Sequence, residues 1–188
     1  MRPPAAPCYR SDVSAINAKA FAQRFDSLGS YLSHAEIEEL LRHLPERRVS
    51  KGEVLLREGG TSGEAFLLWE GTLVVRLGDG EHAIDVGRIN PGTLVGEIAF
   101  LDAGLISATV TAAADVVLLV LGRDQLESLR VSHPRIATSL LRALCQSLAA
   151  RIRGASAALE LMRGVEPSPV SHHRFLDGLR TLFGLSKD

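Results

Sequence analysis

The chain of 188 residues has few cysteines, few aromatic residues and no excess of charge of either sign. Its two cysteines, Cys8 and Cys145, lie far apart in the sequence and provide neither a disulfide framework nor a cysteine metal cluster. The 21 lysines and arginines nearly balance the 22 aspartates and glutamates. This balance argues against a basic surface for nucleic acid or for acidic membranes.

Long apolar runs are missing too. No uncharged apolar stretch approaches the roughly 18 residues that a membrane-spanning helix needs. The opening sequence MRPPAAPCYR lacks the apolar segment of a secretory leader. We therefore expect no membrane span and a cytoplasmic protein.

Motifs for catalysis are also absent. The sequence contains no Gly-x-Ser-x-Gly nucleophile motif, no P-loop and no His-x-His pair. The histidines fall mostly outside the central β-rich region: His34, His43, His82, His133, His172 and His173. We therefore expect no enzymatic activity, no catalytic residue and no metal site.

Two helices are predicted before residue 46. The proline-rich residues 1–10 precede a first, weaker helix over 11–25. In the second helix, Ser33 and Glu36 have the spacing of a capping box, and Pro45 ends the helix. One face of this helix is apolar and consists of Ile37, Leu40, Leu41 and Leu44.

Residues 47–121 consist of short runs of Val, Leu, Ile and Thr that are separated by glycines. Turn signals at such regular spacing predict a compact antiparallel barrel or sandwich. The stretch LGDGE at 77–81 is the strongest single hairpin signal.

A helix begins again at RDQLESL, and from Pro134 the apolar period is helical for about thirty residues. Its apolar positions alternate in steps of four and three: Leu141, Cys145, Leu148, Ile152, Ala155, Leu159 and Met162. We call this stripe the seam. Charged residues flank it: Arg142, Arg151, Arg153 and Glu160. The seam either packs against the protein's own β-domain or forms a parallel two-helix contact in a homodimer.

The chain ends with two short segments. The prolines of GVEPSPVS predict a linker, and residues 173–185 predict a small amphipathic helix. Docking of this tail helix on its own domain is favoured over a partner or a membrane, because Asp177 and Gly178 limit its stability alone.

The order of elements resembles the cyclic nucleotide-binding domain family. The resemblance rests on glycines at regular places in KGEVLLREGG, WEGTLVV and NPGTLVGE, together with the stretch GEIAFLDAGLISATV. It implies a mainly β fold: an antiparallel roll of about eight strands, of the jelly-roll type, with N-terminal helices and a long C-terminal helix. It divides the chain into an N-terminal tail and helix (1–24), the domain (25–163), and a linker with the tail helix (164–188).

In this family the phosphate-binding cassette reads Gly-Glu-x-Ala, followed by Pro-Arg-Ala/Ser-Ala-Thr-Val. The chain matches both halves in register but has Leu105 and Ile106 where the family has Pro-Arg. The resemblance implies that Glu97 accepts the ribose hydroxyl, and that Ser107 and loop amides hold the phosphate. The predicted ligand-binding residues are Gly96, Glu97, Ile98, Ala99, Ile106, Ser107 and Ala108.

Ile106 cannot neutralise a phosphate. The missing charge-assisted hydrogen bonds weaken binding by roughly tenfold to a thousandfold. Either Leu105 and Ile106 fill the vacated pocket, or another cation compensates, for which the sequence offers Arg57, Arg76 and Arg88.

These considerations predict a noncatalytic regulatory module that acts through protein–protein interaction with a degenerate nucleotide pocket. The alternative is a sensor in which cyclic AMP, cyclic GMP or another anionic nucleotide switches a partner-binding surface. Only about 25 residues follow Arg163, so we expect no helix-turn-helix DNA-binding domain. A protein partner and a homodimer are the expected associations.

Overall fold

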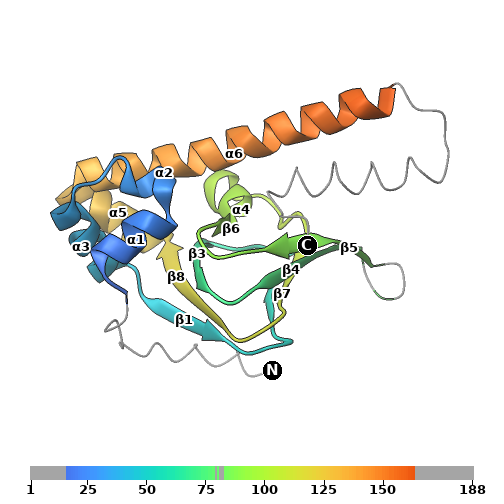
Figure 1. Ribbon diagram of the computed structural model, residues 1–188, viewed down its shortest axis with the longest axis horizontal. Coiled ribbons are helices and arrows are strands. Elements are labelled where there is room, and N and C mark those ends of the chain that lie inside the picture. The colour runs from blue at the N-terminus through green and yellow to red at the C-terminus, as the bar shows by residue number, and fades with distance from the viewer. Residues whose placement is uncertain (1–15, 79, 81–82, 164–188) are drawn as a thin grey trace.

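A computed structural model describes residues 16–78, 80 and 83–163. Within these ranges, two four-stranded antiparallel sheets form a β-roll, and helices cover one side of it (Figure 1). One sheet has the order β1-β8-β3-β6 and the other the order β2-β7-β4-β5. The strands are β1 (Glu46–Val49), β2 (Val54–Leu56), β3 (Glu64–Glu70), β4 (Leu73–Leu77), β5 (Ile84–Ile89), β6 (Leu94–Val95), β7 (Thr109–Ala112) and β8 (Val116–Gly122).

All described helices except one, which lies between β6 and β7, flank the roll in sequence, as predicted. They are α1 (Ala18–Arg24), α2 (Asp26–Gly29), α3 (His34–His43), α4 (Glu97–Asp102), α5 (Arg123–Ser132) and α6 (Pro134–Arg163). The capping box of α3 is confirmed: the Ser33 side chain accepts from the backbone of Glu36, whose carboxylate accepts from the backbone of Ser33. None of the described helices combines the length and the apolarity that a bilayer crossing requires.

The first sheet is buried on both faces, and the two-residue period of its strands explains why. In β3, Ala65, Leu67 and Trp69 face the helices, whereas Phe66 and Leu68 face the second sheet. Strand β8 continues both layers with Leu119 and Leu121 on one face and Leu118 and Val120 on the other. The roll therefore has an inner core between its sheets and an outer core beneath the helices.

Helix α6 covers the outer core along the top of the molecule in Figure 1. Its buried residues are Ile136, Ala137, Leu140, Ala143 and Leu144. On the opposite side of the same core, Phe21 of α1 is fully buried. Helix α1 lies before residue 25, where the sequence analysis placed the start of the domain. It nevertheless contributes to the outer core of that domain.

The hairpin predicted at LGDGE is confirmed in its strands. Strands β4 and β5 pair antiparallel from Leu73 opposite Ile89 to Leu77 opposite Ile84. The linker and the tail helix predicted after Arg163 lie outside the described residues.

Candidate functional site

The predicted cassette begins where β6 turns into the short helix α4. Gly96 makes this turn with φ of +79°, in the left-handed region that favours glycine. A Cβ atom at this position would lie 3.2 Å from the carbonyl oxygen of Glu64, so the turn also requires close backbone approach. Glu97 follows as the first residue of α4, and its side chain is directed into the roll, where it is 1% exposed.

The second half of the cassette runs back along the roll as an extended segment. The backbone of Ile106 is held at both of its polar groups: its N–H donates to Gly60 at 2.8 Å, and its carbonyl accepts from Gly59 at 2.9 Å. This pairing directs the Ile106 side chain into the inner core, where it is 8% exposed, and leaves Leu105 65% exposed. Ile106 lines the pocket, but the alternative in which both residues fill it was wrong for Leu105, because neighbours on an extended segment face opposite ways.

A cation does enter the pocket, and it comes from α6. The Nε atom of Arg151 lies 2.7 Å from Oε1 of Glu97, and Nη2 of Arg151 donates to the carbonyl of Leu94 at 3.2 Å. The Oγ atom of Ser147, one turn earlier on α6, donates weakly to the same Glu97 oxygen at 3.4 Å. The carboxylate that the family uses for a ribose is therefore engaged by the chain's own helix.

Burial raises the pKa of the Glu97 carboxyl, because little water remains to solvate its charge. The attraction of Arg151 and the hydrogen bond from Ser147 act in the opposite direction. Because the Arg151 side chain is itself only 11% exposed, the pair is shielded from solvent screening. The ion pair is thus a buried link between α4 and α6.

The cavity that remains has a volume of about 40 Å3. It is lined mainly by apolar side chains of the two sheets and the cassette, and the lining includes Glu97, Ile106, Ser107 and Arg151. One water needs roughly 10–15 Å3 of such space, so the cavity has room for a few waters.

The structure brings all seven predicted cassette residues together around this cavity. None of Arg57, Arg76 and Arg88, which the sequence offered as substitute cations, lines it. Arg57 is exposed, and Arg76 pairs with Asp85 on the exposed hairpin at 2.5 Å.

Sequence reasoning missed Arg151 because α6 carries two stripes with the same spacing. Leu140, Leu144, Ser147 and Arg151 follow steps of four, three and four and face the domain. The seam lies one residue further along at every step, about 100° around the helix. The domain-facing stripe ends in the polar residues Ser147 and Arg151. The sequence pattern therefore indicated the more apolar seam and not this stripe.

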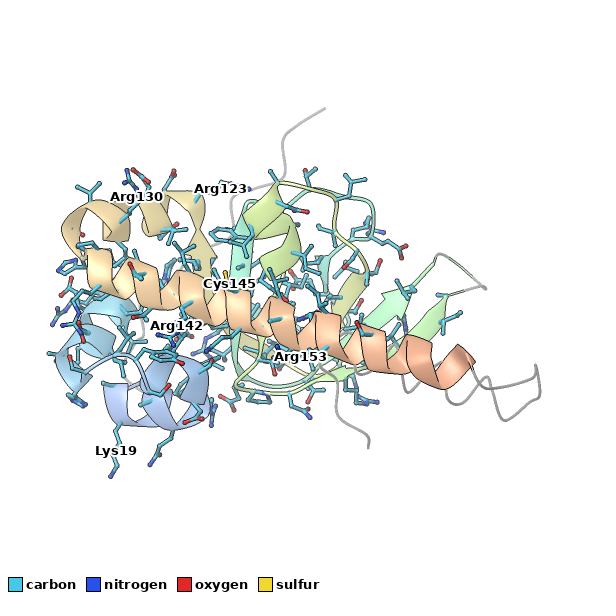
Figure 2. All side chains as sticks on the ribbon, turned by 90° about the horizontal axis from the view of Figure 1, so that it is seen from above. Lys19, Arg123, Arg130, Arg142, Cys145 and Arg153 are labelled. Carbon is cyan, nitrogen blue, oxygen red and sulfur yellow. The ribbon has the colours of Figure 1, made fainter. Side chains whose placement is uncertain are left out.

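The seam itself is left largely uncovered by the described part of the chain. Leu141 is 37% exposed, Ile152 is 65% exposed, Cys145 is exposed and Leu148 is half-buried. Figure 2 looks straight onto α6 and shows Arg142, Cys145 and Arg153 along it. Among the described residues, Leu141, Cys145 and Ile152 are therefore not buried against the protein's own β-domain, and the occupant of the seam stays a prediction. The side chains of Leu159 and Met162 lie outside the described residues.

Comparison with known proteins places these features in a family. The model of the family described as "Cyclic nucleotide-binding domain" matches residues 46–133. A cyclic nucleotide-gated potassium channel of Rhizobium etli is 34% identical over 116 residues, which cover 62% of this chain and 30% of that protein. The chain spans less than a third of the length of the curated relatives it matches.

Solved structures show the same fold. A cyclic nucleotide-binding domain from Methylobacillus flagellatus superposes with a TM-score of 0.67 at 21% identity, covering 81% of this chain and 88% of that one. The catabolite activator protein of Thermus thermophilus gives a TM-score of 0.57 at 27% identity, with 85% and 81% covered. Residues 46–133 of this chain therefore match the cyclic nucleotide-binding domain family, and the β-roll has the fold of the solved cyclic nucleotide-binding domain.

Proposed function

We propose that this chain is a noncatalytic regulatory module that acts through contact with a protein partner while its nucleotide cassette stays closed. The observation that carries the proposal is the buried ion pair between Glu97 and Arg151. It engages the residue that a ribose would need, and the phosphate position holds the apolar Ile106. A ligand would have to break a desolvated ion pair and expel a packed side chain before gaining any contact.

Calorimetric titration with cyclic AMP and cyclic GMP tests the closed cassette. We expect no saturable binding at ligand concentrations up to about 100 µM, because the charge-assisted contact to the phosphate is missing. Micromolar binding that Glu97→Gln weakens would show an open cassette and overturn the proposal.

A second candidate function is supported by the same cation. Arg151 places a guanidinium in the pocket. An anionic nucleotide could therefore replace the ion pair between Arg151 and Glu97: its phosphate would bind Arg151, and its sugar hydroxyl would donate to Glu97. Such a sensor would release α6 from the roll on binding. A panel of nucleotides in thermal melts distinguishes the two functions, because a ligand bound only by the folded state raises the melting temperature. In a sensor, Glu97→Ala abolishes that rise.

For the contact surface we propose the seam, with a second copy of the chain as its occupant. Large apolar side chains at Leu141 and Ile152 are exposed on a helix that is well packed on its other side. Parallel packing of two α6 helices would bury them at four-three spacing.

Ile152→Glu should weaken this dimer by about 2 kcal/mol, close to thirtyfold in its dissociation constant, because the change places a charge in a desolvated contact. Sedimentation at tens of micromolar measures the change. Val131→Glu is the matched control, since Val131 is 74% exposed on α5 and does not belong to the seam. A monomer for the unmodified protein at these concentrations would refute the dimer.

A further inference from the structure

A cluster of two imidazoles and a carboxylate lies at the opposite end of the helical layer from the cassette. Glu39 and His43 are one turn apart on α3, and His133 is the residue between α5 and α6. One nitrogen of each ring and one oxygen of the carboxylate all lie within 4.8 Å of one another. All three side chains are partly buried, with 22% to 39% of their surface exposed.

The orientation of His133 follows from its neighbours. The Ser132 hydroxyl donates its only proton to the carbonyl of Ser128 at 2.7 Å, so its oxygen must accept from Nδ1 of His133 at 2.9 Å. In the neutral ring the lone pair is therefore on Nε2. That atom lies 3.8 Å from Oε1 of Glu39, so two electron-rich atoms lie close together and favour a cation between them.

Glu39 and His43 complete the arrangement. Arg42 pairs with Oε2 of Glu39, which leaves Oε1 as the oxygen nearest to both histidines. The Nδ1 atom of His43 lies 3.6 Å from Oε1 and 3.0 Å from the Glu39 carbonyl, and the two imidazole rings meet edge to face at 5.7 Å. Coordination by Nδ1 would move its proton to the other ring nitrogen.

These distances suit a transition metal. Zinc binds nitrogen and oxygen ligands at about 2.0–2.2 Å, which places tetrahedral ligand atoms about 3.4 Å apart. The carboxylate oxygen lies 3.6 and 3.8 Å from the two histidine nitrogens, and all three ligand atoms lie within 4.8 Å of one another, so side-chain rotations would have to bring them to this value. The contact from Ser132 to His133 is of the kind that orients metal-binding histidines.

We propose that Glu39, His43 and His133 bind one Zn²⁺ ion, with water completing a four-coordinate site. The ion would join α3 to the start of α6. Mixed nitrogen and oxygen ligands of this kind select zinc or a neighbouring transition metal over magnesium or calcium. The sequence analysis expected no metal because it sought ligands on neighbouring strands, whereas these ligands meet across helices about ninety positions apart.

Calorimetric titration of the chelator-treated full chain with zinc chloride tests the site. We expect one ion per chain with a dissociation constant of about 1 µM or tighter, and a rise in melting temperature that a chelator reverses. His133→Asn and Glu39→Gln should each weaken binding at least about tenfold. Visible absorption bands of four-coordinate Co²⁺ in the unmodified protein provide a readout that needs no variant.

Two matched controls locate the ion. His34 and Glu38 have the same spacing on α3, with Nε2 of His34 3.4 Å from Oε1 of Glu38. They are more exposed, and among the described residues they belong to no such cluster of three. His34→Ala should therefore leave zinc binding unchanged. Joint replacement of His172 and His173 by alanine should also leave it unchanged. Absence of saturation up to about 100 µM zinc overturns the proposal, as does zinc binding that survives His133→Asn but is lost with the tail histidines. Neither result depends on nucleotide binding.

Discussion

Ile106→Arg should lower the free energy of unfolding by about 3 kcal/mol and should not create nucleotide binding. Ile106 is 8% exposed in the inner core, and its backbone hydrogen bonds to Gly59 and Gly60 prevent the side chain from turning outward. The new guanidinium would enter a cavity of about 40 Å3 that already holds Arg151. Urea unfolding measures the loss, and calorimetry with cyclic AMP measures binding.

The neighbouring residue provides the control. Leu105 is 65% exposed, so Leu105→Arg should change stability by no more than about 0.5 kcal/mol. If Ile106→Arg instead keeps the stability of the unmodified protein and binds cyclic AMP, the pocket lacks only its cation and the closed cassette is wrong.

Arg151→Met should also cost about 3 kcal/mol, because it leaves the Glu97 carboxylate buried without its partner. Thermal or urea unfolding measures the cost. Arg153→Met is the matched control: Arg153 lies two residues further along α6 and is exposed, so its loss should be nearly neutral. Equal effects of the two changes would show that the ion pair adds nothing.

The pH dependence of stability has a definite sign. Since burial raises the pKa of Glu97, the folded protein keeps this proton at pH values where the unfolded chain has lost it. The contribution of Glu97 to stability therefore falls as the pH rises from the ordinary carboxyl pKa, 4.5, toward the raised value. Arg151→Met should steepen this fall and extend it to higher pH, and Glu97→Gln should remove it.

Local signals made most of the fold predictable. Ser33 and Glu36 marked the start of α3 because a capping box involves residues three apart. The glycine-separated apolar runs predicted the roll, since hairpins such as β4–β5 form between neighbouring segments. The cassette half that begins at Gly96 was recognisable because its turn requires glycine.

The side chains that meet in the site were less predictable. They come from segments far apart in the sequence, and their directions depend on how the helices pack. Arg151 looked like a charge beside the seam, and only the packing of α6 on the roll directs it to Glu97, 54 positions away. His133 and Glu39 also meet through tertiary packing, because Glu39 is on α3 and His133 lies between α5 and α6. Cys145, which the spacing placed in the seam, is exposed, because the domain lies against the adjacent stripe.

Helix α6 has the length and continuity of a lever arm. It is continuous over 30 residues, about 45 Å, and Arg151 lies about 26 Å from Pro134 at its origin. A tilt of about 10° around Pro134 would carry the backbone of Arg151 through about 4–5 Å, and the far end at Arg163 through about 7–8 Å. Because the ion pair to Glu97 spans only 2.7 Å, a small angular displacement at the origin is enough to separate it. If the helix moves as one rigid body, a minor rotation at its base would therefore be enough to break this contact at the cassette.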